Sequence, residues 1–176
     1  IASCLVGSEM CIRDSLLPTS GTTGSKKMVR LSYDNIDANT KSIIHYLEID
    51  SDSRTISSLP MHYSYGLSVM NTYLCSGGQI VLTAYSVLQK QFWDKLRTHG
   101  VTSLSGVPYT YELMNKLEFM EMDLPHLKVL CQAGGKLSAA LNQKLARYAV
   151  ESGKRFYVMY GATEASPRIS YLPHAF

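Results

Sequence analysis

The 176-residue chain has little of what would mark a specialised class of protein. Its 17 basic and 14 acidic residues leave a formal charge of only +3, and neither sign forms a long run. A nucleic-acid surface needs clustered basic residues interleaved with aromatics, so we expect no DNA or RNA partner. No apolar run approaches the roughly 20 residues of a membrane span. With 45% hydrophobic and 18% charged residues, the composition indicates an ordinary globular protein of one domain.

Cysteine is scarce as well. Of the four cysteines, two lie in an N-terminal segment that is unlike the rest of the chain. The other two, Cys75 and Cys131, have apolar neighbours, form no CxxC pair and have no histidine at ligand spacing, which argues against a zinc site. Two buried free thiols suit a reducing compartment, so we expect a cytoplasmic protein.

The N-terminal segment, residues 1–15, is expected to be non-native. Back-translation of Cys4–Ser15 gives a nucleotide string that resembles a transposon-end adapter used in preparing sequencing libraries. We therefore interpret residues 1–15 as a translated adapter fused in frame to a gene fragment. The alternative is a genuine N-terminal strand, and different codons at this junction would establish it. Because the sequence has no initiator Met and no stop-like tail, we expect an interior piece of a longer protein.

Apolar periodicity predicts strands that alternate with helices. Ser32 is a plausible N-cap for a helix over 33–47, because apolar residues recur there at helical spacing. We expect further helices over 66–75, 90–99, 108–120 and 138–151. We expect a short strand that begins at Leu16, before the first motif, and strands over 28–31, 55–59, 79–83, 101–104, 128–132, 156–160 and 168–172. This order predicts an α/β fold with a mostly parallel βαβ sheet flanked by helices. Ligands of such sheets bind at the carboxyl ends of strands, where the motifs described next fall.

The run Thr19–Lys27 (Thr-Ser-Gly-Thr-Thr-Gly-Ser-Lys-Lys) is the most informative motif. Its small residues offer many N–H and O–H donors with little bulk, and its lysines add positive charge, which is typical of a loop that wraps an oligophosphate. A Walker loop is excluded, because Gly21 and Gly24 are too close together and a β-prone segment follows instead of a helix. By itself the run could also be a flexible linker with solvated lysines.

Three further motifs follow predicted strands. Tyr160–Glu164 (Tyr-Gly-Ala-Thr-Glu) combines an aromatic face, a hydroxyl and a carboxylate suited to Mg²⁺, although by itself it could be a capped turn with a solvated glutamate. Gly134-Gly135 could let a nucleobase stack on bare backbone, or could form a tight turn into the next helix. Pro60–Gly66 (Pro-Met-His-Tyr-Ser-Tyr-Gly) could line a substrate pocket, although a lone histidine is more often structural.

In their order along the chain, the four motifs resemble those of the adenylate-forming enzymes, which include acyl-CoA synthetases, aryl-CoA ligases, luciferases and peptide-synthetase adenylation domains. The usual loop of that superfamily is Thr-Ser-Gly-Ser/Thr-Thr-Gly-x-Pro-Lys-Gly, and here Lys26 replaces the proline and Met28 the last glycine. In its Pro-x-aromatic-His-x-x-Gly pattern, His62 falls on the aromatic position and Tyr63 on the histidine. The resemblance spans residues 16–172 and implies an incomplete AMP-binding domain over 16–176.

The resemblance implies ATP-dependent activation of a carboxylic acid to an acyl-adenylate, with release of pyrophosphate and later thioester formation. ATP and Mg²⁺ are the implied cofactors, a small carboxylic acid is the substrate, and coenzyme A or a carrier-protein pantetheine is the acceptor thiol. The implied nucleotide-binding residues are Thr19, Ser20, Gly21, Thr22, Thr23, Gly24, Lys27, Gly134, Gly135, Tyr160, Gly161 and Thr163. The implied catalytic residues are Lys27, Thr163 and Glu164, with Glu164 as the metal ligand, and the implied residues on the acid side are His62, Tyr63 and Gly66.

Two alternatives stay open: an adenylation domain of the peptide-synthetase type, and a non-catalytic nucleotide-binding fragment. No aspartate lies between Arg54 and Phe92 to pair with an amino-acid ammonium, which argues weakly against an amino-acid substrate. The superfamily's ribose-binding aspartate, hinge and C-terminal domain with its catalytic lysine would lie beyond residue 176. We therefore expect the 176-residue piece by itself to be inactive or nearly so.

Overall fold

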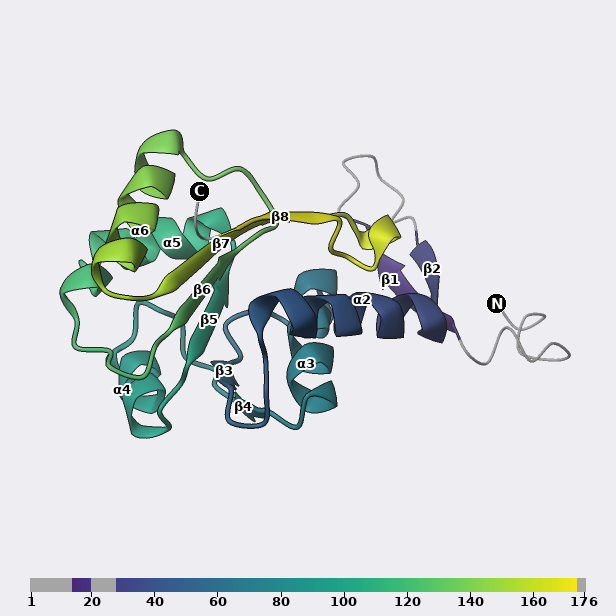
Figure 1. The fold of residues 1–176 in the computed structure, drawn as a ribbon, viewed down its shortest axis with the longest axis horizontal. Coiled ribbons are helices and arrows are strands. Elements are labelled where there is room, and N and C mark those ends of the chain that lie inside the picture. The colour runs from purple at the N-terminus through teal and green to yellow at the C-terminus, as the bar shows by residue number, and fades with distance from the viewer. Residues whose placement is uncertain (1–13, 20–27, 174–176) are drawn as a thin grey trace, which may run out of the picture.

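Residues 14–19 and 28–173 are described in a computed structural model, shown in Figure 1. Over this part the strands are β1 (Asp14–Pro18), β2 (Met28–Ser32), β3 (Arg54–Ile56), β4 (Gln79–Val81), β5 (Ser103–Gly106), β6 (Val129–Gln132), β7 (Arg155–Tyr160) and β8 (Ser170–Leu172). The helices are α2 (Tyr33–Leu47), α3 (Ser64–Cys75), α4 (Lys90–Thr98), α5 (Pro108–Lys116) and α6 (Ala139–Glu151), with short 3₁₀ helices η2 (Phe119–Glu121) and η3 (Thr163–Ala165).

The main sheet has the strand order β4-β3-β5-β6-β7-β8 within the described residues. Neighbouring strands from β4 to β7 are parallel, and β8 runs antiparallel to β7. The predicted α/β fold with a mostly parallel sheet and flanking helices is therefore confirmed. The antiparallel β8 was not specified by the sequence pattern, because the direction of an edge strand depends on how the preceding turn folds back.

Two hydrophobic cores lie on the two faces of this sheet. Successive side chains of a strand point to opposite faces. Leu130 and Phe156 accordingly pack with buried residues of α4, α5 and α6, whereas Cys131 and Tyr157 pack with those of α2 and α3. Figure 1 shows the same division, with α2 and α3 on one side of the strands and α5 and α6 on the other. Helices on both faces explain why β5 and β6 are buried along their whole lengths.

A smaller antiparallel pair, β1 and β2, carries the chain into α2. Its register sets Pro18 opposite Met28 and Asp14 opposite Ser32. Ser32 is the predicted N-cap: its hydroxyl accepts from the Asn35 amide at 3.2 Å, while the Asn35 side chain accepts from the Ser32 amide at 3.2 Å. This reciprocal capping fixes the start of α2. The adapter interpretation of residues 1–15 stays a prediction, because residues 1–13 lie outside the described part.

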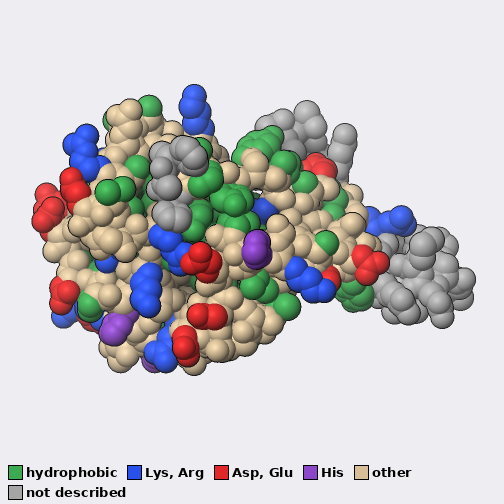
Figure 2. All heavy atoms as spheres, in the orientation of Figure 1, with side chains coloured by type: hydrophobic (Ala, Val, Ile, Leu, Met, Phe, Trp, Pro, Cys, Tyr) green, Lys and Arg blue, Asp and Glu red, His purple; other side chains and the backbone are tan. Residues whose placement is uncertain are grey.

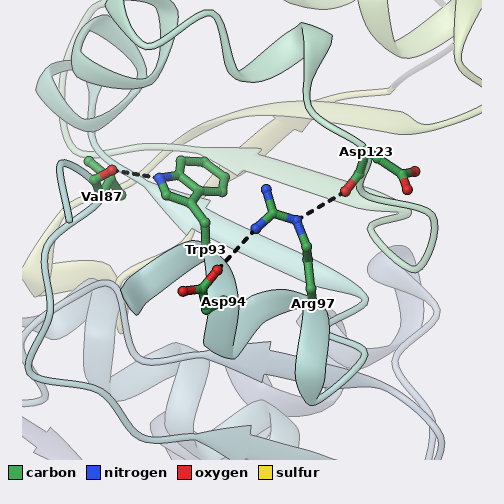
Figure 3. A network of polar contacts seen from close by, with 5 residues as sticks. All are labelled: Val87, Trp93, Asp94, Arg97 and Asp123. Atoms are coloured by element: carbon green, nitrogen blue, oxygen red, sulfur yellow. Dashed lines mark hydrogen bonds and ion pairs between the residues drawn. The ribbon is translucent and has the colours of Figure 1, made fainter. Parts of the chain in front are cut away.

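Helix α4 is held by polar contacts at both ends, as Figure 3 shows. The Trp93 indole donates to the Val87 carbonyl at 2.7 Å, and Arg97 Nε donates to the Asp123 carbonyl at 3.3 Å. Arg97 also forms an ion pair with Asp94 one turn earlier, at 3.4 Å. The Trp93 ring itself is buried, so α4 is joined firmly to the core on its face of the sheet.

Some expected details were wrong. Helix α5 ends at Lys116 instead of near residue 120, because Glu118 adopts a left-handed conformation with φ of 53° and a 3₁₀ turn follows. Strand β3 ends at Ile56, three residues before the predicted end. Cys75 is exposed at the end of α3 rather than buried, while Cys131 is buried as expected.

The surface carries mixed charge. Figure 2 shows acidic and basic side chains scattered over the visible face, with hydrophobic side chains gathered near its middle. In the part of the chain that the structure describes, no helix has the length and apolar character needed to cross a membrane.

Candidate functional site

A cleft of about 1280 Å³ opens at the carboxyl ends of β6 and β7. It lies beside the start of α3 and the segment that joins β7 to β8. Residues from all four predicted motifs line it, namely Thr19, His62, Tyr63, Gly134, Gly135, Tyr160, Gly161 and Thr163. The cleft therefore brings together segments that are widely separated in the sequence, at the edge where parallel sheets bind ligands.

Not every predicted site residue lies in this cleft. Glu164 is exposed in η3, next to the cleft residue Thr163, but does not line the cleft itself. Gly66 is buried in α3, where a Cβ would lie 2.1 Å from the carbonyl oxygen of Pro60, so it permits the close packing of α3 on that turn. Ser20–Gly24 and Lys27 of the expected phosphate loop lie outside the described residues.

The double glycine forms one wall of the cleft. Gly134 has a φ of +82°, and a Cβ there would approach the Tyr63 hydroxyl to 2.7 Å. Both the backbone conformation and the close contact favour glycine. The Gln132 side chain donates to the Gly135 carbonyl at 2.8 Å, which holds the turn after β6. The result is bare backbone beside an aromatic ring, a surface on which a planar group can lie.

The turn after β7 forms a second wall. A Cβ on Gly161 would lie 1.7 Å from the Pro167 carbonyl oxygen, so only glycine lets the chain fold back so tightly. The amide of Ile169 then donates to the Tyr160 carbonyl at 3.0 Å, which starts the antiparallel pairing with β8. The Tyr160 side chain is 67% exposed and is free to contact a ligand.

A hydroxyl pair joins the two sides of the cleft. Ser64 Oγ lies 3.2 Å from Thr163 Oγ1, so a hydrogen bond links the first residue of α3 to η3. Ser64 is 7% exposed, and its position therefore limits the orientation of the Thr163 hydroxyl. Sequence reasoning included Ser64 in the Pro60–Gly66 motif but gave it no role. Its place in a motif that follows a predicted strand was the one available signal.

Arg168 is a cleft residue that the sequence did not suggest as functional. Its guanidinium donates to the Tyr46 hydroxyl at 3.2 Å and to Ser68 Oγ at 3.4 Å, and lies 2.6 Å from the sulfur of Met159. Its Cζ is 4.3 Å from the centroid of the Tyr65 ring. All four neighbours are uncharged. No pattern in the sequence indicated that segments this far apart would surround one cation.

The tyrosine and thiol groups around Arg168 remain protonated at neutral pH. Burial raises the pKa of Tyr46 to about 12, although the nearby Arg168 charge lowers it in part. Burial raises the pKa of Tyr65 well above its usual value, and that of the Cys131 thiol to about 11. Ionisation of these groups therefore supplies no counter-charge to the guanidinium.

The donor groups fit a nucleotide better than a protein-held metal cluster. Among residues 14–19 and 28–173, no group of three or more His, Cys, Asp or Glu side chains could hold a metal ion. Mg²⁺ bound with phosphates needs only one or two carboxylates, because phosphate oxygens and water complete its shell. Glu164, the residue after Thr163 in η3, carries an exposed carboxylate of the kind that Mg²⁺ binds.

The sequence pattern of one enzyme family covers almost the whole chain. Residues 15–175 match the AMP-binding enzyme family. The chain belongs to that family. Among curated relatives, this AMP-binding chain is 32% identical to an acyl-CoA synthetase of Alternaria alternata, over 88% of its own length and 26% of the relative's. It is 28% identical to a feruloyl-CoA synthase of an Amycolatopsis species, over 95% of its length and 33% of the relative's.

A third relative is named as a ligase for a carrier protein. The chain is 26% identical to a D-alanine–D-alanyl carrier protein ligase of Bacillus licheniformis, over 88% of its length and 31% of the relative's. Named relatives of this AMP-binding chain therefore include ligases for coenzyme A and for a carrier protein.

Solved structures agree with the fold. One is o-succinylbenzoate coenzyme A synthetase of Bacillus subtilis in complex with its acyl-adenylate intermediate, with a TM-score of 0.78, 26% identity, and coverage of 92% of this chain and 32% of that one. Another is a long-chain-fatty-acid–CoA ligase of Archaeoglobus fulgidus, with a TM-score of 0.76, 25% identity, and coverage of 90% and 33%. The AMP-binding chain spans between about a quarter and a third of the length of these relatives.

Proposed function

We propose that the protein carrying this chain uses ATP to convert a carboxylic acid to an acyl-adenylate, releases pyrophosphate, and then forms a thioester. The observation that supports this most directly is the cleft at the ends of β6 and β7, where glycine backbone, an aromatic ring and the Thr163 hydroxyl converge. Relatives that ligate acids to coenzyme A point to the same chemistry. Coenzyme A is our first choice of acceptor, and a carrier-protein thiol is the alternative.

On this proposal each wall of the cleft has a separate role. Gly134, Gly135 and Tyr160 would hold the adenine, because flat backbone and an aromatic face both suit a purine. Gly161 would keep the turn tight enough for the backbone to approach the ribose-phosphate. Thr163 would donate its hydroxyl to an α-phosphate oxygen.

The phosphate end of the site would combine described and undescribed residues. Thr19 lines the cleft where β1 ends, and Ser20–Gly24 with Lys27 would hold the β- and γ-phosphates. Glu164 would hold Mg²⁺, which when bound neutralises charge on the phosphates. The acid carboxylate would then attack the α-phosphorus in line, so that this chain contributes mainly orientation and charge stabilisation.

The acid would enter from the side of α3. His62 and Tyr63 line the cleft at the start of that helix and are our proposed substrate-side residues. Gly66 would contribute indirectly, because its close contact with the Pro60 carbonyl positions the start of α3. We also propose a cytoplasmic location, since the buried Cys131 is a free thiol.

Replacing the Thr163 hydroxyl tests the proposal. The isosteric Thr163→Val in the complete protein should lower the rate of acid-dependent ATP–pyrophosphate exchange by roughly 100- to 1000-fold, because one phosphate donor is lost without a change of shape. The matched control Thr98→Val lies at the exposed end of α4 and should leave the rate unchanged. Exchange that is equally fast in both variants would show that the Thr163 hydroxyl has no role in the reaction. The absence of exchange in the wild type with any acid would contradict the proposed function.

A further inference from the structure

The guanidinium of Arg168 is a partly buried cation without a counter-ion in the described part of the chain. The ion pairs found there are Lys41–Asp37, Arg97–Asp94 and Arg155–Glu48, and none involves Arg168. Its Nε is buried and has no hydrogen-bond partner among the described residues. An arginine remains charged at any ordinary pH, and a buried charge is unfavourable unless it is paired. An anion that enters the cleft would therefore be attracted to the unpaired guanidinium charge of Arg168.

The surroundings of Arg168 indicate what kind of anion it would meet. The guanidinium stacks on the ring of Tyr65 and contacts Met159, and both of these residues also line the cleft. Tyr171 of β8 lines the same region. Aromatic and thioether groups suit the carbon skeleton of an organic acid, whereas the phosphates would meet the hydroxyl and glycine groups at Thr19 and Thr163. On the proposed function, Arg168 would therefore lie on the side of the cleft that holds the carbon skeleton of the acid.

The guanidinium is also held in a defined orientation. Tyr46 of α2 and Ser68 of α3 accept from its two terminal nitrogens, while the Asn39 side chain donates to its backbone carbonyl at 3.0 Å. A planar guanidinium held in this way keeps donor capacity for a carboxylate at little entropic cost. A purely structural clamp could be built with a neutral side chain, and it would not need to hold a charge inside a cleft.

We propose that Arg168 recognises a second carboxylate on the substrate, so that the acid activated at this site is a dicarboxylic acid. One carboxylate is adenylated at Thr163, and the other forms a charge-assisted hydrogen bond with the Arg168 guanidinium. Arg168 is therefore a specificity-determining residue and takes no part in the chemical step. This inference rests on the proposed function.

The test compares acids that differ by one charge at nearly the same length. ATP–pyrophosphate exchange is measured on the complete protein with straight-chain dicarboxylic acids from succinate to dodecanedioate, with terephthalate, and with the monomethyl ester of each. The wild type should use the best diacid with a kcat/KM roughly 10- to 100-fold above that of its ester, which corresponds to one hydrogen bond to a charged group. A wild type that prefers the esters would overturn the inference and leave the proposed function intact. No exchange with any acid would overturn both.

Two variants separate recognition from structural support. Arg168→Met should bring the ratio between diacid and ester close to one by raising KM for the diacid, while kcat for the ester and KM for ATP stay as in the wild type. Arg168→Lys keeps the charge and should retain part of the preference. Arg155→Met removes an arginine that is paired with Glu48 at the other end of β7, and should leave the preference unchanged.

Other outcomes would contradict the assignment of Arg168. If Arg168→Met lowers exchange equally for diacids and esters, the residue is a structural clamp. If it raises KM for ATP, the guanidinium serves the nucleotide instead. Should Arg168→Met not fold, as judged by circular dichroism, the preference of the wild type and the Arg168→Lys ratio still decide the matter.

Discussion

At the scale of single residues, the candidate site depends on glycines, which have no side chain, as much as on residues with functional groups. Gly134 and Gly161 each occupy a position where a Cβ would collide with Tyr63 or with the Pro167 carbonyl. Both lie in motifs that sequence reasoning selected for their lack of bulk. The structure adds a local reason for each glycine, because the walls of the cleft could not approach so closely with any other residue.

Two residues at this scale could not have been selected from the sequence. Ser64 matters because it contacts Thr163, and Arg168 because it contacts Tyr46 and Ser68. Each contact joins segments that are about 100 or more positions apart in the chain. Local patterns carry no information on such pairs, since the pairing is created by the sheet and the helices between them.

The buried thiol of Cys131 predicts a loss of stability in alkali. Burial raises its pKa from 9.0 to about 11. Below about pH 9 the thiol is protonated in both states; as pH rises from there, the unfolded chain loses the proton first, so unfolding becomes more favourable. The free energy of unfolding should fall by on the order of 2 kcal/mol between about pH 9 and pH 11 through this group.

Urea unfolding of two variants at several pH values measures this effect. Cys131→Ala should make the pH dependence between about pH 9 and pH 10 shallower, whereas Cys75→Ala, which removes an exposed thiol, should leave it unchanged. Tyr46, whose pKa burial raises from 10.0 to about 12, adds a further loss from about pH 10 upward that both variants should share. An unchanged alkaline slope in Cys131→Ala would show that the thiol is not responsible.

At the scale of secondary-structure elements, the sequence predicted order and type better than ends. The N-cap at Ser32 was predicted, because the chemistry of a cap lies within four neighbouring residues. The end of α5 was not, because the left-handed Glu118 and the following 3₁₀ turn place Phe119 in the core with Trp93 and Tyr148. The residue at which α5 ends is therefore decided by packing between distant segments.

Helix α4 offers a test of how strongly an element is held. Trp93 is 4% exposed and lies against Phe92 and Phe119, with its indole bonded to Val87 (Figure 3). Trp93→Ala should lower the free energy of unfolding by about 3–5 kcal/mol, because it leaves a large cavity and an unpaired carbonyl. Asp94→Ala breaks only the partly exposed pair with Arg97 and should cost less than about 1 kcal/mol. Thermal or urea unfolding compares the two, and equal losses would contradict this view of α4.

At the scale of the whole molecule, the main sheet has an exposed edge at β8 in the described part of the chain. Strand β8 is exposed along its length, and the cleft beside it is lined by residues such as Tyr160 that are largely accessible. The match covers 26% and 33% of the length of two curated relatives. We therefore propose that the reaction requires further parts of a longer protein.

The 176-residue chain and the complete protein should differ greatly in activity. With the same acid, ATP and Mg²⁺, we expect exchange by the isolated chain to be at least about 100-fold slower, since orientation of the reactants would be incomplete. Nucleotide binding measured by calorimetry shows whether the isolated chain retains its cleft. Equal exchange rates would refute the idea that the chain by itself is inactive.

The sequence by itself determined the alternation of strands and helices, the cap of α2, the four motifs and the family. These properties are encoded in short stretches, where spacing, capping and glycine content act between neighbours. Only the tertiary structure decided that β8 runs antiparallel, that Cys75 is exposed, that Ser64 meets Thr163 and that Arg168 has no acidic partner in the described part. Those features arise from contacts between distant segments, and such contacts exist only once the sheet has brought the segments together.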